Sequence, residues 1–175
     1  MPTIDIQYYD SPAGELVLGS FGGKLCLCDW RRRVNREAMD ARLIQYTGAE
    51  FAERATEVTD RVRQELDGYF AGLCREFSIP LFMAGTPFQM KVWEALREVQ
   101  YGHTETYLQL ARRIHQPGAV RAVAAANAAN PLAILVPCHR IVGNGGTLTG
   151  YSGGIEAKRI LLALERNHEK GRRLF

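Results

Sequence analysis

The residues best suited to chemistry stand together in the tetrapeptide Pro137-Cys138-His139-Arg140. An apolar run precedes it and a glycine-rich segment follows, so Cys138 is expected to leave the core beside a flexible loop. Cysteine attacks as its thiolate, and a free thiol with a pKa of about 8.5 is only slightly ionised at neutral pH. A neighbouring histidine or cation raises that fraction. The tetrapeptide therefore predicts a nucleophile, although a buried structural cysteine beside a surface histidine has the same pattern.

Charge is distributed unevenly along the 175-residue chain. Residues 1–85 carry ten basic and thirteen acidic side chains, whereas residues 86–175 carry twelve basic and six acidic ones. The interval between Glu105 and Glu156 holds four arginines and no acid. Because Lys and Arg attract phosphates and carboxylates repel them, this interval predicts a surface that faces a polyanion. A buried apolar segment that needs no acids is the alternative explanation.

The first half of the chain has the patterns of strands and turns, followed by helices. Alternating residues predict strands over 3–9, 14–21 and 24–30, with Gly22-Gly23 as a hairpin turn. The clearest helix covers 58–73, and 77–81 is a further candidate strand. These patterns favour a small antiparallel sheet with flanking helices.

Two cysteines, Cys26 and Cys28, alternate in the third predicted strand and are expected to share one face of it. With no further Cys or His close by, they make a poor zinc site, so no metal is expected. The N-terminus lacks a basic segment followed by an apolar one, and no run approaches the roughly 18 apolar residues of a membrane span. We therefore expect a cytoplasmic protein without disulfides.

The second half begins with a strong helix start after a boundary near residue 85. Thr86 is a suitable N-cap, Pro87 suits the first helical position, and Gln89 completes a capping box. Helices are expected over 107–115, 119–129 and 157–165, with a loop at 143–154. The sequence thus predicts an α+β protein of two domains, residues 1–85 and residues 86–175, the second mostly helical with a helix-turn-helix.

The second helix of this predicted helix-turn-helix consists almost entirely of small residues. Seven alanines fall between positions 119 and 129, together with Arg121 and Asn127. Alanine favours helices, so a tightly packed internal helix is one interpretation. A helix with small side chains and one arginine near its start would also fit closely into a nucleic-acid groove. Spacing alone does not decide between these.

The second half resembles the O6-alkylguanine-DNA alkyltransferases, also called methylated-DNA–protein-cysteine methyltransferases. The resemblance covers residues 86–165, about half of the chain, and its motifs occur in order and spacing. They are Thr86-Pro87-Phe88-Gln89, Val92-Trp93, Tyr107, Gln109-Leu110-Ala111, Ala119-Val120-Arg121-Ala122-Val123, Asn130-Pro131, Ile134, Pro137-Cys138-His139-Arg140, Gly150-Tyr151-Ser152-Gly153-Gly154, Lys158, Leu161-Leu162 and Glu165. The first half matches only as a strand-rich domain of variable sequence.

The resemblance implies stoichiometric repair of DNA, in which an alkyl group moves irreversibly from O6 of guanine to Cys138. It also implies activity on O4-alkylthymine. His139, acting through a water, takes the thiol proton, and Glu165 orients that histidine. Asn130 supports the turn around the site, and Tyr107 contacts the 3′ phosphate and protonates the departing guanine.

The same resemblance implies a flipped base bound in a pocket and a minor-groove interface. Arg121 would replace the extrahelical base in the stack. Residues implied to bind the base are Tyr151, Ser152, Arg121, Tyr107 and Ile141. Residues implied to contact DNA are Arg121, Ala122, Arg112, Arg113, Asn127 and Arg140. The expected partner is double-stranded DNA containing O6-alkylguanine, bound by a monomer, with cooperativity along DNA left open, and no cofactor is expected.

Three other functions are weighed against this one. A damage-binding protein of the same fold that transfers nothing would lack the acceptor cysteine, whereas Cys138 is present. A Cys-His hydrolase would turn over and ignore DNA, which the acid-free basic interval disfavours. A transcription regulator would discriminate among unmodified DNA sequences.

Overall fold

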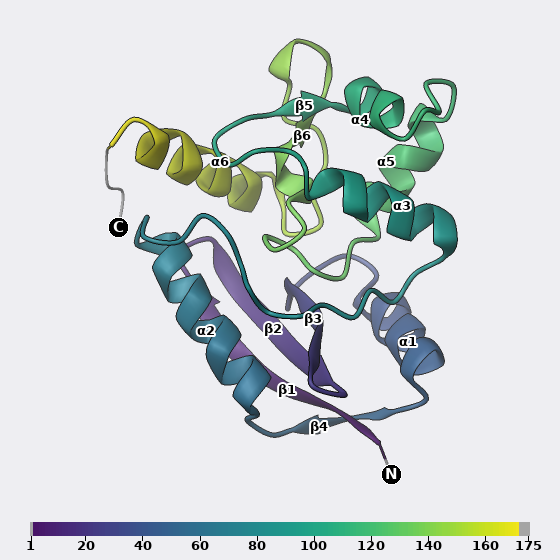
Figure 1. The fold of residues 1–175 in the computed structure, drawn as a ribbon, viewed down its shortest axis with the longest axis vertical. Helices are drawn as coiled ribbons and strands as arrows, with labels where there is room; N and C mark the ends of the chain where they lie inside the picture. The colour runs from purple at the N-terminus through teal and green to yellow at the C-terminus, as the bar shows by residue number, and fades with distance from the viewer. Residues whose placement is uncertain (1, 172–175) are drawn as a thin grey trace.

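The first half of the chain forms a four-stranded sheet in a computed structural model that describes residues 2–171 (Figure 1). Its spatial order is β3-β2-β1-β4. The first three strands are antiparallel, and β4 lies parallel to β1 at the edge. The strands are β1 (Thr3–Ser11), β2 (Gly14–Phe21), β3 (Lys24–Trp30) and β4 (Glu50–Glu53).

The three strands expected from alternation are confirmed. At the edges of the sheet, the structure differs from the prediction in two places. Gly22 and Gly23 have φ angles of 58° and 78°, as a tight turn between β2 and β3 requires. The candidate strand at 77–81 is wrong, because only Leu81 forms an isolated bridge, to Leu25. The fourth strand is β4. Its sequence is short and has a glutamate at each end, so it did not predict a strand.

A β-bulge in β3 separates the two strand cysteines. Gly19 pairs with Leu27 and Ser20 pairs with Leu25, so Cys26 is the extra residue. Cys26 packs in the cluster on the α1 side of the sheet, whereas Cys28 belongs to the main core. The expectation that they share a face is wrong because the bulge breaks the two-residue period.

Two helices complete this half of the fold, α1 (Arg36–Thr47) and α2 (Glu57–Phe70). Thr56 caps α2 by accepting from the backbone N–H of Thr59. Through Val62, Leu66 and Tyr69, α2 packs its apolar stripe against the sheet.

The second half is mostly helical and stands above the sheet in Figure 1. Thr86 and Gln89 form the expected capping box at the start of the first helix, with both hydrogen bonds present. The α4–α5 pair forms the helix-turn-helix, and His115 in its turn has a positive φ of 58°. The elements are α3 (Pro87–Leu96), β5 (Glu105–Thr106), α4 (Tyr107–Arg113), α5 (Val120–Ala128), a 3₁₀ helix η1 (Cys138–Arg140), β6 (Ile141–Val142), a 3₁₀ turn η2 (Asn144–Gly146) and α6 (Ile155–Glu169).

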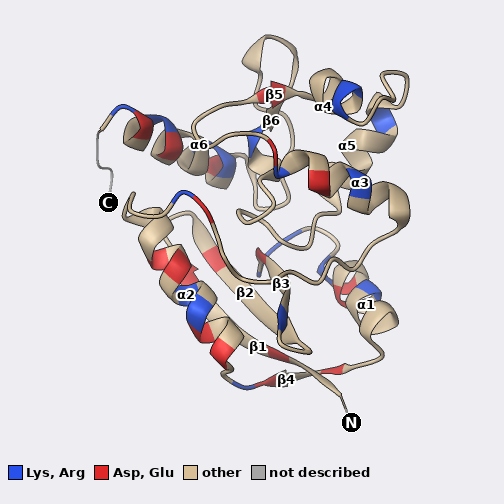
Figure 2. Cartoon of the chain, viewed as in Figure 1, with Lys and Arg blue, Asp and Glu red and all other residues tan. Residues whose placement is uncertain are grey.

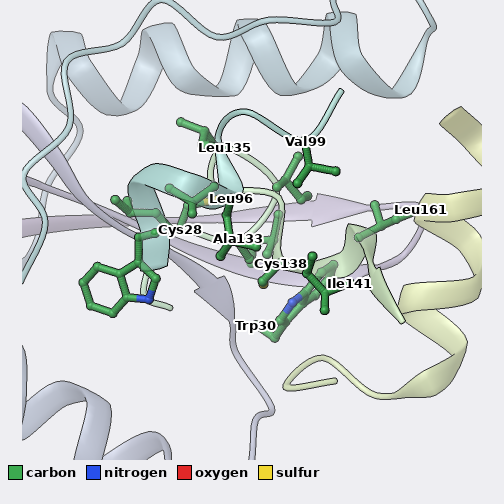
Figure 3. Close-up of a cluster of buried hydrophobic side chains, with 14 of the residues drawn as sticks. Cys28, Trp30, Leu96, Val99, Ala133, Leu135, Cys138, Ile141 and Leu161 are labelled. Atoms are coloured by element: carbon green, nitrogen blue, oxygen red, sulfur yellow. The ribbon is translucent and has the colours of Figure 1, made fainter. Parts of the chain in front are cut away.

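One hydrophobic core joins the two halves. It contains Leu18 and Tyr69 from the first half and Trp93 and Leu161 from the second. Figure 3 shows Cys138 in this core together with Cys28 and Trp30 of β3. Within residues 2–171, no helix is long and apolar enough to cross a bilayer.

Candidate active site

A strained loop presents Cys138 at the start of η1. Ile134 has a φ of 72°, a conformation that a β-branched residue rarely adopts. Asn130 holds this loop from inside: its Nδ2 donates to the carbonyl of Val136 over 2.8 Å, and its Oδ1 accepts from the N–H of Leu132 over 2.9 Å. Both bonds of this buried amide therefore tie the backbone that precedes Cys138, in the turn that the resemblance assigned to Asn130.

Cys138 lies at one wall of a cavity of about 500 Å³. The side chain is only 3% exposed, so the cavity rather than open solvent gives access to its sulfur. The cavity is large enough for a small flat ligand such as a nucleobase. Its lining residues are Arg33, Val34, Asn35, Tyr107, Ala124, Asn127, Ala128, Cys138, Thr149, Gly150, Tyr151 and Ser152.

Most of the expected base-binding residues meet at this cavity. Tyr107 accepts a hydrogen bond from the Thr149 hydroxyl over 3.3 Å. Tyr151 packs edge-to-face on Trp30, with ring centroids 5.9 Å apart. Two of the expected residues are not part of the cavity lining. Ile141 is fully buried in the core, and Arg121 is exposed on α5.

One wall of the cavity comes from residues that the sequence analysis missed. Arg33, Val34 and Asn35 follow β3 and reach the cavity from the first half of the chain. Val34 is 80% exposed, which is unusual for an apolar side chain at the rim of a site. No local motif marks these three residues, because their place depends on how the two halves pack.

Arginines of the same region hold the C-terminal end of α5. Arg33 donates to the carbonyl of Ala128 over 2.9 Å, and Arg42 donates to the carbonyl of Ala129. Asp29, which is fully buried, anchors Arg33 with a 2.8 Å ion pair. Cations at a helix C-terminus satisfy its unpaired carbonyls and oppose the negative end of its dipole. The first half therefore fixes the position of the second helix of the helix-turn-helix.

His139 and Glu165 form a fully buried pair. Nε2 of His139 lies 2.6 Å from Oε2 of Glu165, so this nitrogen carries the proton and donates it to the carboxylate. Nδ1 of His139 is buried and has no hydrogen-bond partner among the described residues. That nitrogen is the one left to accept a proton, as a general base must.

Arg140 is also part of this buried network. Its Nε donates to Oε1 of Glu165 over 2.8 Å and its Nη1 donates to the carbonyl of Val99 over 2.7 Å. The residue is 7% exposed. Because its donors are used inside the protein, the sequence-based assignment of Arg140 to DNA contact is replaced by a role in holding Glu165.

Burial and hydrogen bonds set the protonation states of Cys138, His139 and Glu165. Burial raises the pKa of the Cys138 thiol, with Asn130 and Lys158 opposing the rise, so the thiol requires a base. Burial lowers the pKa of His139 below its usual value, against the pull of Glu165, so the imidazole is neutral and able to act as that base. Burial alone would raise the pKa of Glu165, but its donors His139 and Arg140 outweigh this and hold it well below the usual range.

Lys158 of α6 ties the glycine-rich loop to the core. Its ammonium is buried and donates to the carbonyls of Ile141, over 2.5 Å, and Thr149, over 3.3 Å. Among the described residues no carboxylate pairs with it. This lysine therefore connects α6 with the loop that carries Tyr151 and Ser152.

Replacing Lys158 with methionine should destabilise the protein by about 1–3 kcal/mol, because two partly or fully buried carbonyls lose their donor. The free energy of unfolding in urea measures this. Lys170→Met, an exposed change at the end of the same helix, is the control and should have no measurable effect. Equal stability of the two variants would contradict the tethering role.

The face formed by α4 and α5 carries the expected polyanion-binding residues. Figure 2 shows basic and no acidic residues on these two helices. Arg112, Arg121 and Ala122 are exposed there. Arg113 is partly neutralised, because it pairs with Glu105 and Glu98.

Asn127 was expected to contact DNA, but the structure buries it. It is 6% exposed, and its Nδ2 faces the carbonyl of Cys138 over 3.5 Å. Its place in the cavity lining makes it a wall of the pocket rather than part of the outer surface.

Comparisons with known proteins agree with this geometry. Residues 87–167 match the family described as 6-O-methylguanine DNA methyltransferase, DNA binding domain. The methylated-DNA–protein-cysteine methyltransferase of Haemophilus influenzae is 42% identical over 95% of this chain and 88% of its own length. That of Mycolicibacterium paratuberculosis is 52% identical over 60% of this chain, a match that spans 64% of the relative.

The fold is also shared with solved structures. The crystal structure of Mycobacterium tuberculosis O6-methylguanine methyltransferase matches with a TM-score of 0.80 and 39% identity, covering 94% of each chain. A crystal structure of Mycobacterium tuberculosis OGT in complex with DNA matches over the same shares with a TM-score of 0.79. The α+β class expected from the sequence is thereby confirmed.

Proposed function

The chain belongs to the family of methylated-DNA–protein-cysteine methyltransferases, which repair DNA by alkyl transfer to a cysteine, and we propose that Cys138 is the acceptor here. The observation that carries this proposal is the position of Cys138, at the wall of a base-sized cavity and next in sequence to the buried His139–Glu165 pair. DNA is the partner of this family, and O6-alkylguanine is the proposed substrate within it.

The proposed reaction is a displacement at the alkyl carbon. The bond from Sγ of Cys138 to that carbon forms while the bond from carbon to O6 breaks, and the bonding electrons stay with the guanine. The thiol proton passes through a water to Nδ1 of His139, and the Tyr107 hydroxyl gives a proton to the departing guanine. The partnerless Nδ1 and the lowered pKa of His139 support this assignment. A thioether is stable towards these groups, so each molecule reacts once.

The alkylated base is proposed to reach Cys138 by leaving the duplex. A base edge inside the stack cannot approach a thiol in a cavity, and flipping it costs a few kcal/mol. Tyr151 and Ser152 line the cavity and would bind the flipped base, while exposed Arg121 near the start of α5 would fill the gap in the stack. Arg112 and Ala122, exposed on the same face, would contact the DNA backbone.

Intact mass spectrometry tests the proposal. The protein is mixed with a duplex that carries one O6-methylguanine, and in parallel with the same duplex carrying guanine. We expect a gain of one methyl group, only with the methylated duplex and never exceeding one per molecule. Peptide mapping should locate the methyl on Cys138 rather than on Cys26, Cys28 or Cys74.

The other outcomes identify the alternatives. Tight binding of the methylated duplex without a change in mass would indicate a damage-binding protein of the same fold. A methyl group on another cysteine would refute the assignment of Cys138 while leaving the family activity intact.

A further inference from the structure

We propose that Tyr69, on α2 in the first half of the chain, is a positioning residue for the alkyl transfer, because its hydroxyl holds the carboxylate that orients His139. This inference rests on the proposed function and adds to it a residue outside the motifs around Cys138. It also gives the sheet-containing half a direct part in the chemistry.

The geometry around Glu165 carries the inference. The Tyr69 hydroxyl donates to Oε2 of Glu165 over 2.6 Å, and the same oxygen accepts from Nε2 of His139 over 2.6 Å. The other donors to this carboxylate are Arg140 and the N–H of Gly102, both from the second half. Among the described hydrogen bonds to Glu165, that of Tyr69 is the one that comes from the first half.

The Tyr69 ring is held too firmly for its hydroxyl to move elsewhere. The residue is 0% exposed, and its ring packs against Phe70, Phe77 and Tyr101 with centroids 5.1, 5.8 and 6.2 Å apart. A buried tyrosine hydroxyl needs a partner, and this one has an oxygen that also serves the reaction. Burial and the neighbouring Glu165 raise the pKa of Tyr69 well above its usual value, so it stays a donor.

The hydrogen bond has a chemical consequence for His139. A donor on Oε2 draws off part of the negative charge that would otherwise stabilise a protonated imidazole. The groups facing the His139–Glu165 pair are Arg140 beside it, Lys158 of α6, Tyr69 of α2 and Tyr101, which lies near Glu165. Removing the Tyr69 donor leaves the cations in place and strengthens the pull of Glu165 on His139. The pKa of His139 should then rise, which protonates the base at a higher pH.

Tyr69→Phe tests this role because it removes only the hydroxyl. In single-turnover assays on methylated duplex, we expect the rate constant of transfer at saturating protein to fall about tenfold, similar to the loss when a hydrogen-bond partner of a metal-bound histidine is removed. The dissociation constant for the duplex should not change. The acid limb of the rate–pH profile should move to higher pH, and an NMR titration should show the same direction for the pKa of His139.

Tyr9→Phe is the matched control. Tyr9 of β1 also packs in the main core, and its hydroxyl also donates to a carboxylate over 2.6 Å, that of Asp67 on α2. It does not touch Glu165 or His139. This variant loses a comparable hydrogen bond, so its free energy of unfolding should fall as that of Tyr69→Phe does. Its rate constant of transfer and its pH profile should match the wild type.

The outcomes separate this inference from the proposed function. A wild type that gains no methyl group overturns the proposed function itself. An active wild type with an unchanged Tyr69→Phe rate and profile overturns only the role of Tyr69. Equal losses in Tyr69→Phe and Tyr9→Phe, or a loss of duplex affinity instead of rate, would also overturn it.

Discussion

Cys138→Ala should gain no methyl group at all from a duplex carrying O6-methylguanine, however long the reaction runs. The substitution removes the sulfur that is proposed to form the new bond, so the expected effect is complete rather than a reduced rate. Affinity for the methylated duplex should persist, because Cys138 lies at the cavity wall and the exposed basic residues lie on α4 and α5. Intact mass and equilibrium binding measure the two properties.

Cys28→Ala is the control for this experiment. Cys28 is fully buried in the same core cluster and is a free cysteine, so its substitution makes a similar change in packing. It should still take up one methyl group per molecule. Methyl uptake by Cys138→Ala, or its loss in Cys28→Ala alone, would show that the acceptor has been assigned to the wrong residue.

Glu165→Gln should impair both stability and chemistry. The carboxylate accepts five hydrogen bonds, and an amide would turn one of its oxygens into a donor facing other donors. It would also leave the buried Arg140 without its counter-charge. Breaking such a pair from one side costs about 3–5 kcal/mol of the free energy of unfolding. Loss of an oriented base should slow transfer by about 10²–10⁴-fold.

Glu169→Gln separates these effects from the general effect of removing a charge from α6. Glu169 lies one turn further along and pairs with Arg75 over 2.5 Å, but both side chains are nearly half exposed. Exposed pairs contribute about 0–1 kcal/mol, so this variant should resemble the wild type in urea unfolding and in transfer rate. If Glu165→Gln were no less stable and no slower than Glu169→Gln, the hydrogen bonds around Glu165 would support neither the fold nor the transfer.

The stability difference between the wild type and Glu165→Gln should depend on pH in one direction. The pKa of Glu165 is held well below its usual range in the folded protein, so its contribution is fully present above the unfolded value of about 4.3. It is lost only as the pH falls below that value, through the folded one. Urea unfolding should therefore give a constant difference near neutrality and a smaller one in acid.

Much of the fold follows from local patterns, which explains why the sequence predicted it. The alternation in residues 3–30 and the capping box at Thr86 depend on neighbours a few positions away, and both appear as expected. The bulge at Cys26 and the edge strand β4 depend on pairing between strands, and both were missed. The division at residue 85 stays a prediction, and one core crosses it.

The candidate site divides in the same way. The order of motifs in residues 86–165 indicated the family to which the chain belongs and predicted Cys138, His139 and Glu165 as its site residues. Local sequence also places a basic, acid-free interval over the helix-turn-helix.

Only the tertiary structure decided which charges and hydroxyls face that site. Arg140 looks like a surface cation in sequence, yet packing turns it inward onto Glu165. Tyr69 looks like one more apolar residue of an amphipathic helix, yet its hydroxyl meets a carboxylate 96 positions away. Such contacts depend on how the sheet-containing half and the helical half pack together, and no local periodicity encodes that arrangement.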